Sequence, residues 1–147
     1  MKWRVYVAIL LFILPLFFAG ANVSNGENTS QPSIWIMHPA ENNLYLGYRD
    51  IYLGTYYIET PFSIIVGSIV YYFLYGVWVV TDKGVEKVEM YVDGKFVKVE
   101  TEPYGEDENT CSWLIHWCVP GFHEITVIAY DSSNNAAIAQ RDVMVIL

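Results

Sequence analysis

Alternating side chains around a two-residue turn constrain this chain more than any other feature. Between residues 85 and 92, apolar side chains alternate with polar or mixed ones, and Asp93-Gly94 follows directly. Alternation with period two places the two sets of side chains on opposite faces of a β-strand. Asp-Gly readily adopts the positive φ angles of a tight hairpin turn, and residues 95–100 read as the returning strand. The sequence therefore predicts a β-hairpin with Asp93 and Gly94 as its structural turn.

The chain from residue 34 to residue 147 continues in the same way. Runs rich in Val, Ile, Tyr and Trp are separated by turn residues, and no run keeps the 3.6-residue period of a helix. His123 stands between a turn and a strand, where an imidazole can cap backbone groups, and Asp131 begins a turn whose side chains hydrogen-bond their own backbone. About seven strands predict an all-β fold, an antiparallel β-sandwich, with Trp113 or Trp117 between its sheets.

Three segments resemble the immunoglobulin-like domains of secreted and surface proteins from archaea and bacteria. Residues 84–95, Gly-Val-Glu-Lys-Val-Glu-Met-Tyr-Val-Asp-Gly-Lys, are similar to a hairpin of that family. Residues 120–135, which run from Pro-Gly-Phe-His to Asp-Ser-Ser-Asn-Asn, and residues 34–42 resemble two further stretches of it. The resemblance is strongest over residues 84–100 and 119–147. It implies an immunoglobulin-like sandwich whose motifs are structural and bring no catalytic residue with them.

The first 21 residues have the three parts of an export signal. A short basic start precedes an apolar run, and small residues follow at positions 19–21. The run is short for a bilayer crossing, which usually needs about 20 residues, but an uncleaved N-terminal membrane anchor remains the alternative. We therefore expect a signal peptide or anchor helix at residues 1–21, a polar linker at 22–33 and the sandwich at 34–147. Both alternatives give an extracytoplasmic location, secreted or anchored to the outer face of the cell membrane.

Charge limits the partners that the chain can bind. Sixteen Asp and Glu against eight Lys and Arg give a net charge of −8, which repels nucleic acid phosphates and anionic lipid head groups. We expect an envelope or secreted protein as partner, no nucleic acid, and contact with a membrane only through an uncleaved N-terminal segment. Five tyrosines could stack on a glycan or a partner protein, or pack the open end of the sandwich. They are Tyr45, Tyr48, Tyr52, Tyr56 and Tyr57.

Residues 62–80 are free of charge and long enough to span a membrane as a helix. Their Val, Ile and aromatic content fits a pleated sheet better, and Gly67 and Gly76 divide them into strand-length pieces. We predict strands here. The alternative is a membrane-integrated accessory protein with residues 62–80 as a second span.

Cys111 and Cys118 are the only cysteines, and an even pair in an oxidising compartment makes them a candidate disulfide. On one straight strand their Cα atoms would lie about 23 Å apart, whereas a disulfide needs about 4.4–6.8 Å. A bridge therefore requires a chain reversal within residues 112–117. Two buried thiols are the alternative.

Motifs for catalysis and metal binding are absent from the sequence. There is no nucleophile elbow, phosphate-binding loop or paired metal-ligand spacing, and His38, His116 and His123 lack the arrangement of a zinc site. We therefore expect no enzyme, no metal and no cofactor. The function expected is adhesion or protein–protein interaction at the cell surface, with a carbohydrate-binding module as a further alternative.

Overall fold

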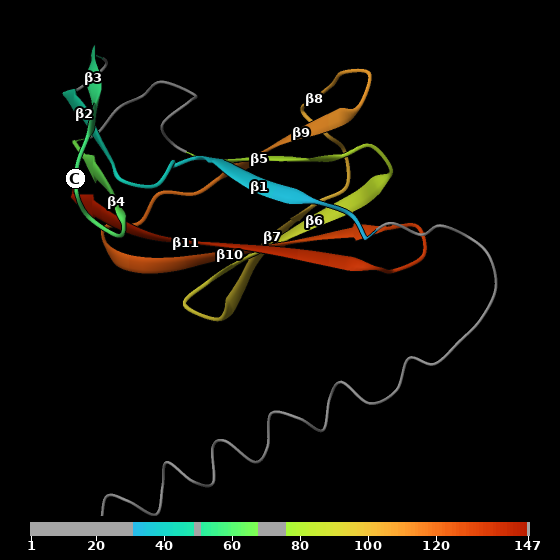
Figure 1. The fold of residues 1–147 in the computed structure, drawn as a ribbon. Helices are drawn as coiled ribbons and strands as arrows, with labels where there is room; N and C mark the ends of the chain where they lie inside the picture. The colour runs from blue at the N-terminus through green and yellow to red at the C-terminus, as the bar shows by residue number, and fades with distance from the viewer. Residues whose placement is uncertain (1–30, 49–50, 68–75, 147) are drawn as a thin grey trace, which may run out of the picture.

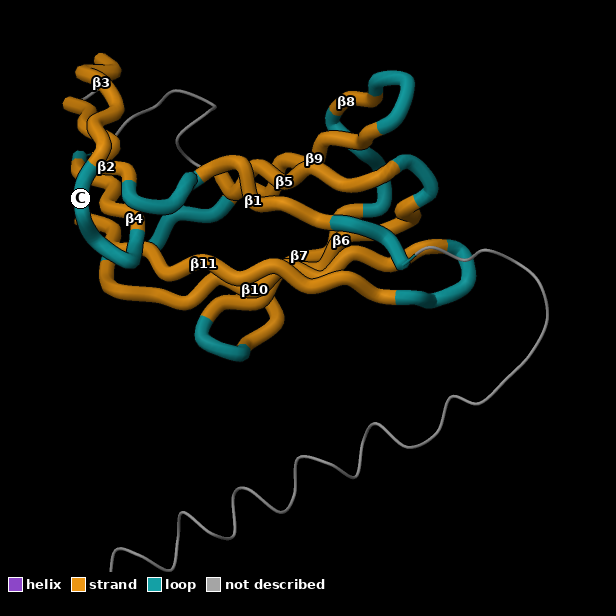
Figure 2. Tube along the Cα trace, viewed as in Figure 1, coloured by secondary structure: helices purple, strands orange, loops and turns teal. Residues whose placement is uncertain are grey.

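The protein is all-β in the computed structural model, which describes residues 31–48, 51–67 and 76–146. These residues form eleven strands and no helix (Figures 1 and 2). In chain order the strands are β1 (Ile34–His38), β2 (Asn43–Tyr48), β3 (Ile51–Tyr57), β4 (Ser63–Val66), β5 (Gly76–Asp82), β6 (Val85–Val92), β7 (Lys95–Glu100), β8 (Gly105–Glu106), β9 (Thr110–His116), β10 (Gly121–Asp131) and β11 (Ala136–Ile146). The predicted signal or anchor at residues 1–21, and most of the linker at 22–33, lie outside the described residues.

The strands form two sheets that face each other. The small sheet has the order β1-β5-β9-β8, and the large sheet has the order β3-β2-β4-β11-β10-β6-β7 (Figure 1). Alternate residues of both sheets point inward and close the core, as the period of a strand requires. Trp113 is buried between the sheets, and its indole N–H donates a 3.0 Å hydrogen bond to Thr81 Oγ1. Trp117 is partly buried against the same core.

This strand order is that of an immunoglobulin-like sandwich. The small sheet follows the A-B-E-D order of such domains, and β11-β10-β6-β7 follows G-F-C-C′. The first strand of the fold is divided, because β1 lies in the small sheet whereas β4 lies in the large sheet beside β11. The predicted class of fold is confirmed at this level.

Two details of the prediction need correction. There are eleven strands among the described residues instead of about seven, and the sandwich is not purely antiparallel, because β4 pairs in parallel with both β11 and β2. The chain crosses from the small sheet to the large one after β1 and inserts the β2–β3 hairpin before β4. The crossing places β4 parallel to β11, and the inserted hairpin places β2 parallel to β4.

Strands also occupy both ends of the charge-free stretch at residues 62–80. β4 lies in the large sheet and β5 in the small one, so the alternative of a single helical span across this stretch is wrong. Gly67 has a φ of +90°, and a Cβ on it would lie 1.9 Å from the carbonyl oxygen of Gly47. Only glycine fits this close approach. No helix in the described part of the chain is long and apolar enough to cross a bilayer.

Cys111 and Cys118 are free thiols, so the predicted disulfide is wrong. The physical reason is the straight path of β9, which runs from Thr110 to His116 without the reversal that a bridge requires. Cys111 is buried near the start of β9, and Cys118 is partly buried two residues beyond its end. Burial raises the pKa of both thiols.

Candidate interaction surface

The β2–β3 hairpin extends the large sheet beyond β4, at the end of the sandwich where the C-terminus also lies (Figure 1). β2 pairs with β4 on one side and with β3 on the other, and β3 is the last strand of the sheet. An immunoglobulin-like sandwich does not need this hairpin, because β4 already completes the large sheet next to β11. The hairpin is therefore an addition to the fold.

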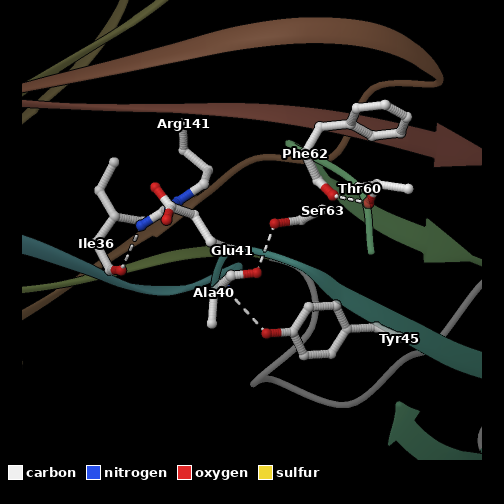
Figure 3. Close-up of polar contacts among 8 residues, drawn as sticks. All are labelled: Ile36, Ala40, Glu41, Tyr45, Thr60, Phe62, Ser63 and Arg141. Carbon is white, nitrogen blue, oxygen red and sulfur yellow. Dashed lines mark hydrogen bonds and ion pairs between the residues drawn. The ribbon is translucent and has the colours of Figure 1, made fainter. Parts of the chain in front are cut away.

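Buried polar contacts hold the root of the hairpin (Figure 3). The backbone N–H of Ala40 donates to the Tyr45 hydroxyl at 2.9 Å, and Ser63 Oγ donates to the Ala40 carbonyl at 2.6 Å. Ser63 is fully buried and Tyr45 nearly so. Ala40 lies where the chain leaves the small sheet after β1. Because Tyr45 belongs to β2 and Ser63 to β4, these two bonds attach Ala40 to both of these strands of the large sheet.

Arg141 completes the root from β11. It shares the inward face of that strand with Val143 and Val145, and its guanidinium donates to the Ile36 carbonyl of β1 at 3.4 Å and forms an ion pair with Glu41 (Figure 3). Burial lowers the pKa of Arg141. Arg141 was not among the site residues predicted from the sequence. The signal was there, because Arg141 falls on the apolar face of an alternating strand, where a charge needs a partner.

Five large apolar side chains of β3 are exposed, and we call them the hairpin surface. They are Ile51, Tyr52, Leu53, Tyr56 and Tyr57. Tyr57 is the most open of them at 74%. No charged residue lies in β2 or β3, so the surface has neither an apolar cover nor the charges that usually keep an edge strand in water.

The predicted tyrosine cluster is divided between two roles. Tyr45 is a core residue, whereas Tyr52, Tyr56 and Tyr57 are exposed. The side chain of Tyr48 lies outside the described residues. The difference arises because the opposite sheet does not extend over β3 (Figure 2).

A second apolar surface lies on the outer side of the large sheet. One row of register partners crosses five strands, from β3 to β10, and a shorter row lies beside it. The first row is Tyr56, Leu44, Ile64, Met144 and Phe122, and the second is Leu46, Val66 and Ile146. The Phe62 ring packs edge-on against Phe122, with ring centroids 5.3 Å apart. We call these nine residues the outer apolar face.

Acidic residues border this face. Glu124 of β10 is the register partner of Asp142 of β11, and both side chains are exposed in the row next to Met144 and Phe122. A small open hollow of about 190 Å³ lies beside them, lined by Glu41, Pro61, Glu124, Gln140, Arg141 and Asp142. All of these side chains except that of Pro61 are polar, but no group of three metal-ligating residues comes together in the described part of the chain.

The predicted turn residues lie near strand ends of the large sheet. Asp93 and Gly94 both have positive φ, 51° and 73°, as a two-residue hairpin turn requires. His123 Nδ1 lies 2.8 Å from the Asp93 carboxylate, which also accepts the backbone N–H of Glu124 at 2.9 Å. This contact raises the pKa of His123 and lowers that of Asp93. It ties the β6–β7 turn to the start of β10, a structural role.

Asp131 also has a local role, in the turn that follows β10. The Asp131 carboxylate accepts the backbone N–H groups of Ser133 and Asn135 at 2.9 and 2.8 Å, and these bonds, with that of the Asn135 side chain, lower its pKa. His38 is partly buried at the end of β1, and desolvation of its ring lowers its pKa to about 4. His38, His116 and His123 lie on three different strands.

The strand order defines an immunoglobulin-like β-sandwich module. No family model matches the chain, and no curated protein matches it. Among solved structures it is similar to the fibronectin(III)-like modules of Clostridium thermocellum CbhA, at 19% identity and a TM-score of 0.43. The match covers 79% of this chain and 47% of that chain. The fold assignment therefore stands on the strand order.

Proposed function

We propose that this protein is a non-enzymatic, extracytoplasmic immunoglobulin-like module that mediates adhesion or protein–protein contact at the cell surface. The observation that carries the proposal is the hairpin surface. Its partner is another envelope or secreted protein.

The energetics of β3 support this role. Ordering the backbone of seven residues costs about 1–2 kcal/mol each, and burial of apolar side chains is the usual compensation. β3 buries little, since six of its seven residues are exposed. Its large apolar side chains add nothing to the core, so their burial against a partner accounts for them better than stability does.

Charge and the N-terminal segment support the location. A net charge of −8 over the whole chain favours solubility near a crowded surface and disfavours binding to nucleic acids and anionic lipids. The basic, apolar and small-residue parts of residues 1–21 are typical of an export signal. Protease added to intact host cells should therefore degrade the protein without lysis, and complete protection until lysis would exclude this location.

Site-specific photo-crosslinking in host cells tests the contact. A photo-reactive amino acid at Tyr57 should crosslink a discrete envelope or secreted protein. The matched control is Phe96, which is 57% exposed on β7 at the opposite edge of the same sheet. Equal crosslinking from both positions, or none from Tyr57, would exclude the hairpin surface as the contact.

A glycan is the second candidate partner, because Tyr56 and Tyr57 present exposed rings on adjacent positions. A glycan array separates the two candidates. Glycan binding that is lost in both Tyr56→Ala and Tyr57→Ala would identify a carbohydrate-binding module. If the wild-type protein binds no glycan on the array, the protein partner is the remaining candidate.

A further inference from the structure

The outer apolar face differs from the outward side of β6 in the same sheet. Beyond the acidic pair Glu124 and Asp142, the outward side chains of β6 form polar contacts: Lys87 pairs with Glu89 at 2.8 Å, and Tyr91 donates to Glu89 at 2.9 Å. This is the usual character of a sheet surface in water. The apolar rows therefore mark an area that is partly uncovered in the single chain.

A partner reaches this area more easily across the face than along the edge. The pairing of β2 with β3 shifts between Leu46–Gly54 and Gly47–Tyr52, so that Leu53 is an extra residue on β3. Gly54 has a φ of +138° at this bulge. A bulge interrupts the row of backbone groups that a new strand would need, but it leaves the outward side chains of β2, β4 and β11 in place.

We propose that the outer apolar face binds a second copy of the same chain, as a two-fold symmetric dimer. The proposal rests on the proposed contact function and names a partner for it. β2, β3 and β4 contain no charged residue in a chain of net charge −8. Two copies that meet over these strands avoid the like-charge repulsion that would oppose contact through the acidic remainder.

The exposed area sets the strength of this dimer. Tyr56, Phe122 and Ile146 are each about half exposed, and the two aromatic side chains among them each bury roughly 150–250 Å² when covered completely. With their partly exposed neighbours they offer roughly 500 Å² on each copy, or about 1,000 Å² in total. This value is at the lower limit for specific interfaces. We expect a weak dimer, with a dissociation constant on the order of micromolar or higher.

The acidic row also fixes the arrangement of the two copies. Glu124 and Asp142 border one side of the face. When the strands of the second copy run antiparallel to those of the first, the two acidic rows lie at opposite ends of the interface. Net repulsion between the copies persists at long range, so salt should strengthen the dimer by screening it. A cationic partner would show the opposite dependence.

Sedimentation of the protein, purified as its host cell processes it, tests the dimer. We expect concentration-dependent association from monomer to dimer between roughly 1 and 300 μM, tighter at about 0.5 M salt than at 0.05 M. Ile146→Lys should weaken association at least about tenfold. The matched control is Ile138→Lys, because Ile138 is 63% exposed on the outward side of the same strand but lies outside the rows. Association through the N-terminal segment would leave both variants unchanged.

Other outcomes would overturn the dimer. One is a wild-type protein that stays monomeric over the whole range, and another is equal association of the two lysine variants. Circular dichroism checks that Ile146→Lys folds, and Phe122→Lys on the neighbouring strand repeats the test if it does not. A monomer whose Tyr57 position still crosslinks a different envelope protein would reject the dimer and keep the proposed function. Loss of crosslinking in a protein that does dimerise would reject the hairpin contact alone.

Discussion

The ion pair at the hairpin root gives an asymmetric prediction. The Arg141 side chain is only 13% exposed, whereas the Glu41 side chain is 65% exposed. Arg141→Met keeps most of the apolar stem and removes a charge from the interior. Glu41→Gln leaves that charge inside and removes its counter-charge. We expect Glu41→Gln to destabilise the protein more than Arg141→Met does.

The structure sets the magnitudes. Breaking a fully buried ion pair costs about 3–5 kcal/mol, and a fully exposed pair contributes about 0–1 kcal/mol. With one partner buried and the other mostly hydrated, we expect Glu41→Gln to cost about 1–2 kcal/mol. Arg141→Met loses the ion pair with the mostly hydrated Glu41 and a long hydrogen bond to the Ile36 carbonyl, but it no longer desolvates a cation. Its free energy of unfolding should lie within about 1 kcal/mol of the wild-type value.

Urea unfolding and thermal melting measure both effects, with a shift of roughly 4 °C or more for each kcal/mol in a domain of this size. The double variant is the internal control. It should behave like Arg141→Met alone, because Glu41 needs no partner in water once the buried cation is gone. A larger loss of stability in Arg141→Met than in Glu41→Gln would refute the reasoning and show that the pair stabilises the root as a unit.

Three further predictions concern the core, the turn and the thiols. Trp113→Phe should cost about 2–3 kcal/mol in urea unfolding, because it leaves a cavity and removes the hydrogen bond to Thr81, and a loss below about 0.5 kcal/mol would contradict that packing. The raised pKa of His123 adds stability that is lost as pH rises above about 6.5, and the lowered pKa of Asp93 adds stability that is lost below about pH 4. Asp93→Asn should therefore lower the free energy of unfolding more at about pH 5.5 than at about pH 8.5. Equal losses at the two pH values would count against the His123–Asp93 pair. Denatured but unreduced protein should react with two equivalents of a thiol reagent, since Cys111 and Cys118 are free. A protein that reacts with none would show that the two cysteines form a disulfide.

Local sequence patterns predicted the later half of the fold because the residues that determine its hairpins lie close together in the sequence. The β6–β7 hairpin needs only alternating side chains and a dipeptide that accepts positive φ. The divided first strand could not be predicted in this way. β4 has four residues, and its parallel partner in β11 lies some 80 positions away. Nothing in the composition of so short a strand indicates which sheet it joins.

The candidate surface was only partly accessible to sequence reasoning. Tyr45 and Tyr57 lie in runs of the same composition, yet one is in the core and the other is in water. What separates them is the extent of the opposite sheet, a property of the assembled sandwich. Arg141 was accessible in principle, because its place among inward-facing residues required a buried counter-charge or acceptor.

A comparison of the two edge strands of the large sheet shows whether stability or contact with a partner better explains the β2–β3 hairpin. β7 and β3 are both edge strands and almost fully exposed. β7 contains Lys95, Lys98 and Glu100, the charged residues that protect an edge from association, whereas β3 contains none. A chain that needed only a stable, soluble sandwich would gain from the same protection at both edges. Because the unprotected edge is also the one added to the basic fold, its apolar side chains are better explained by a binding partner than by the core.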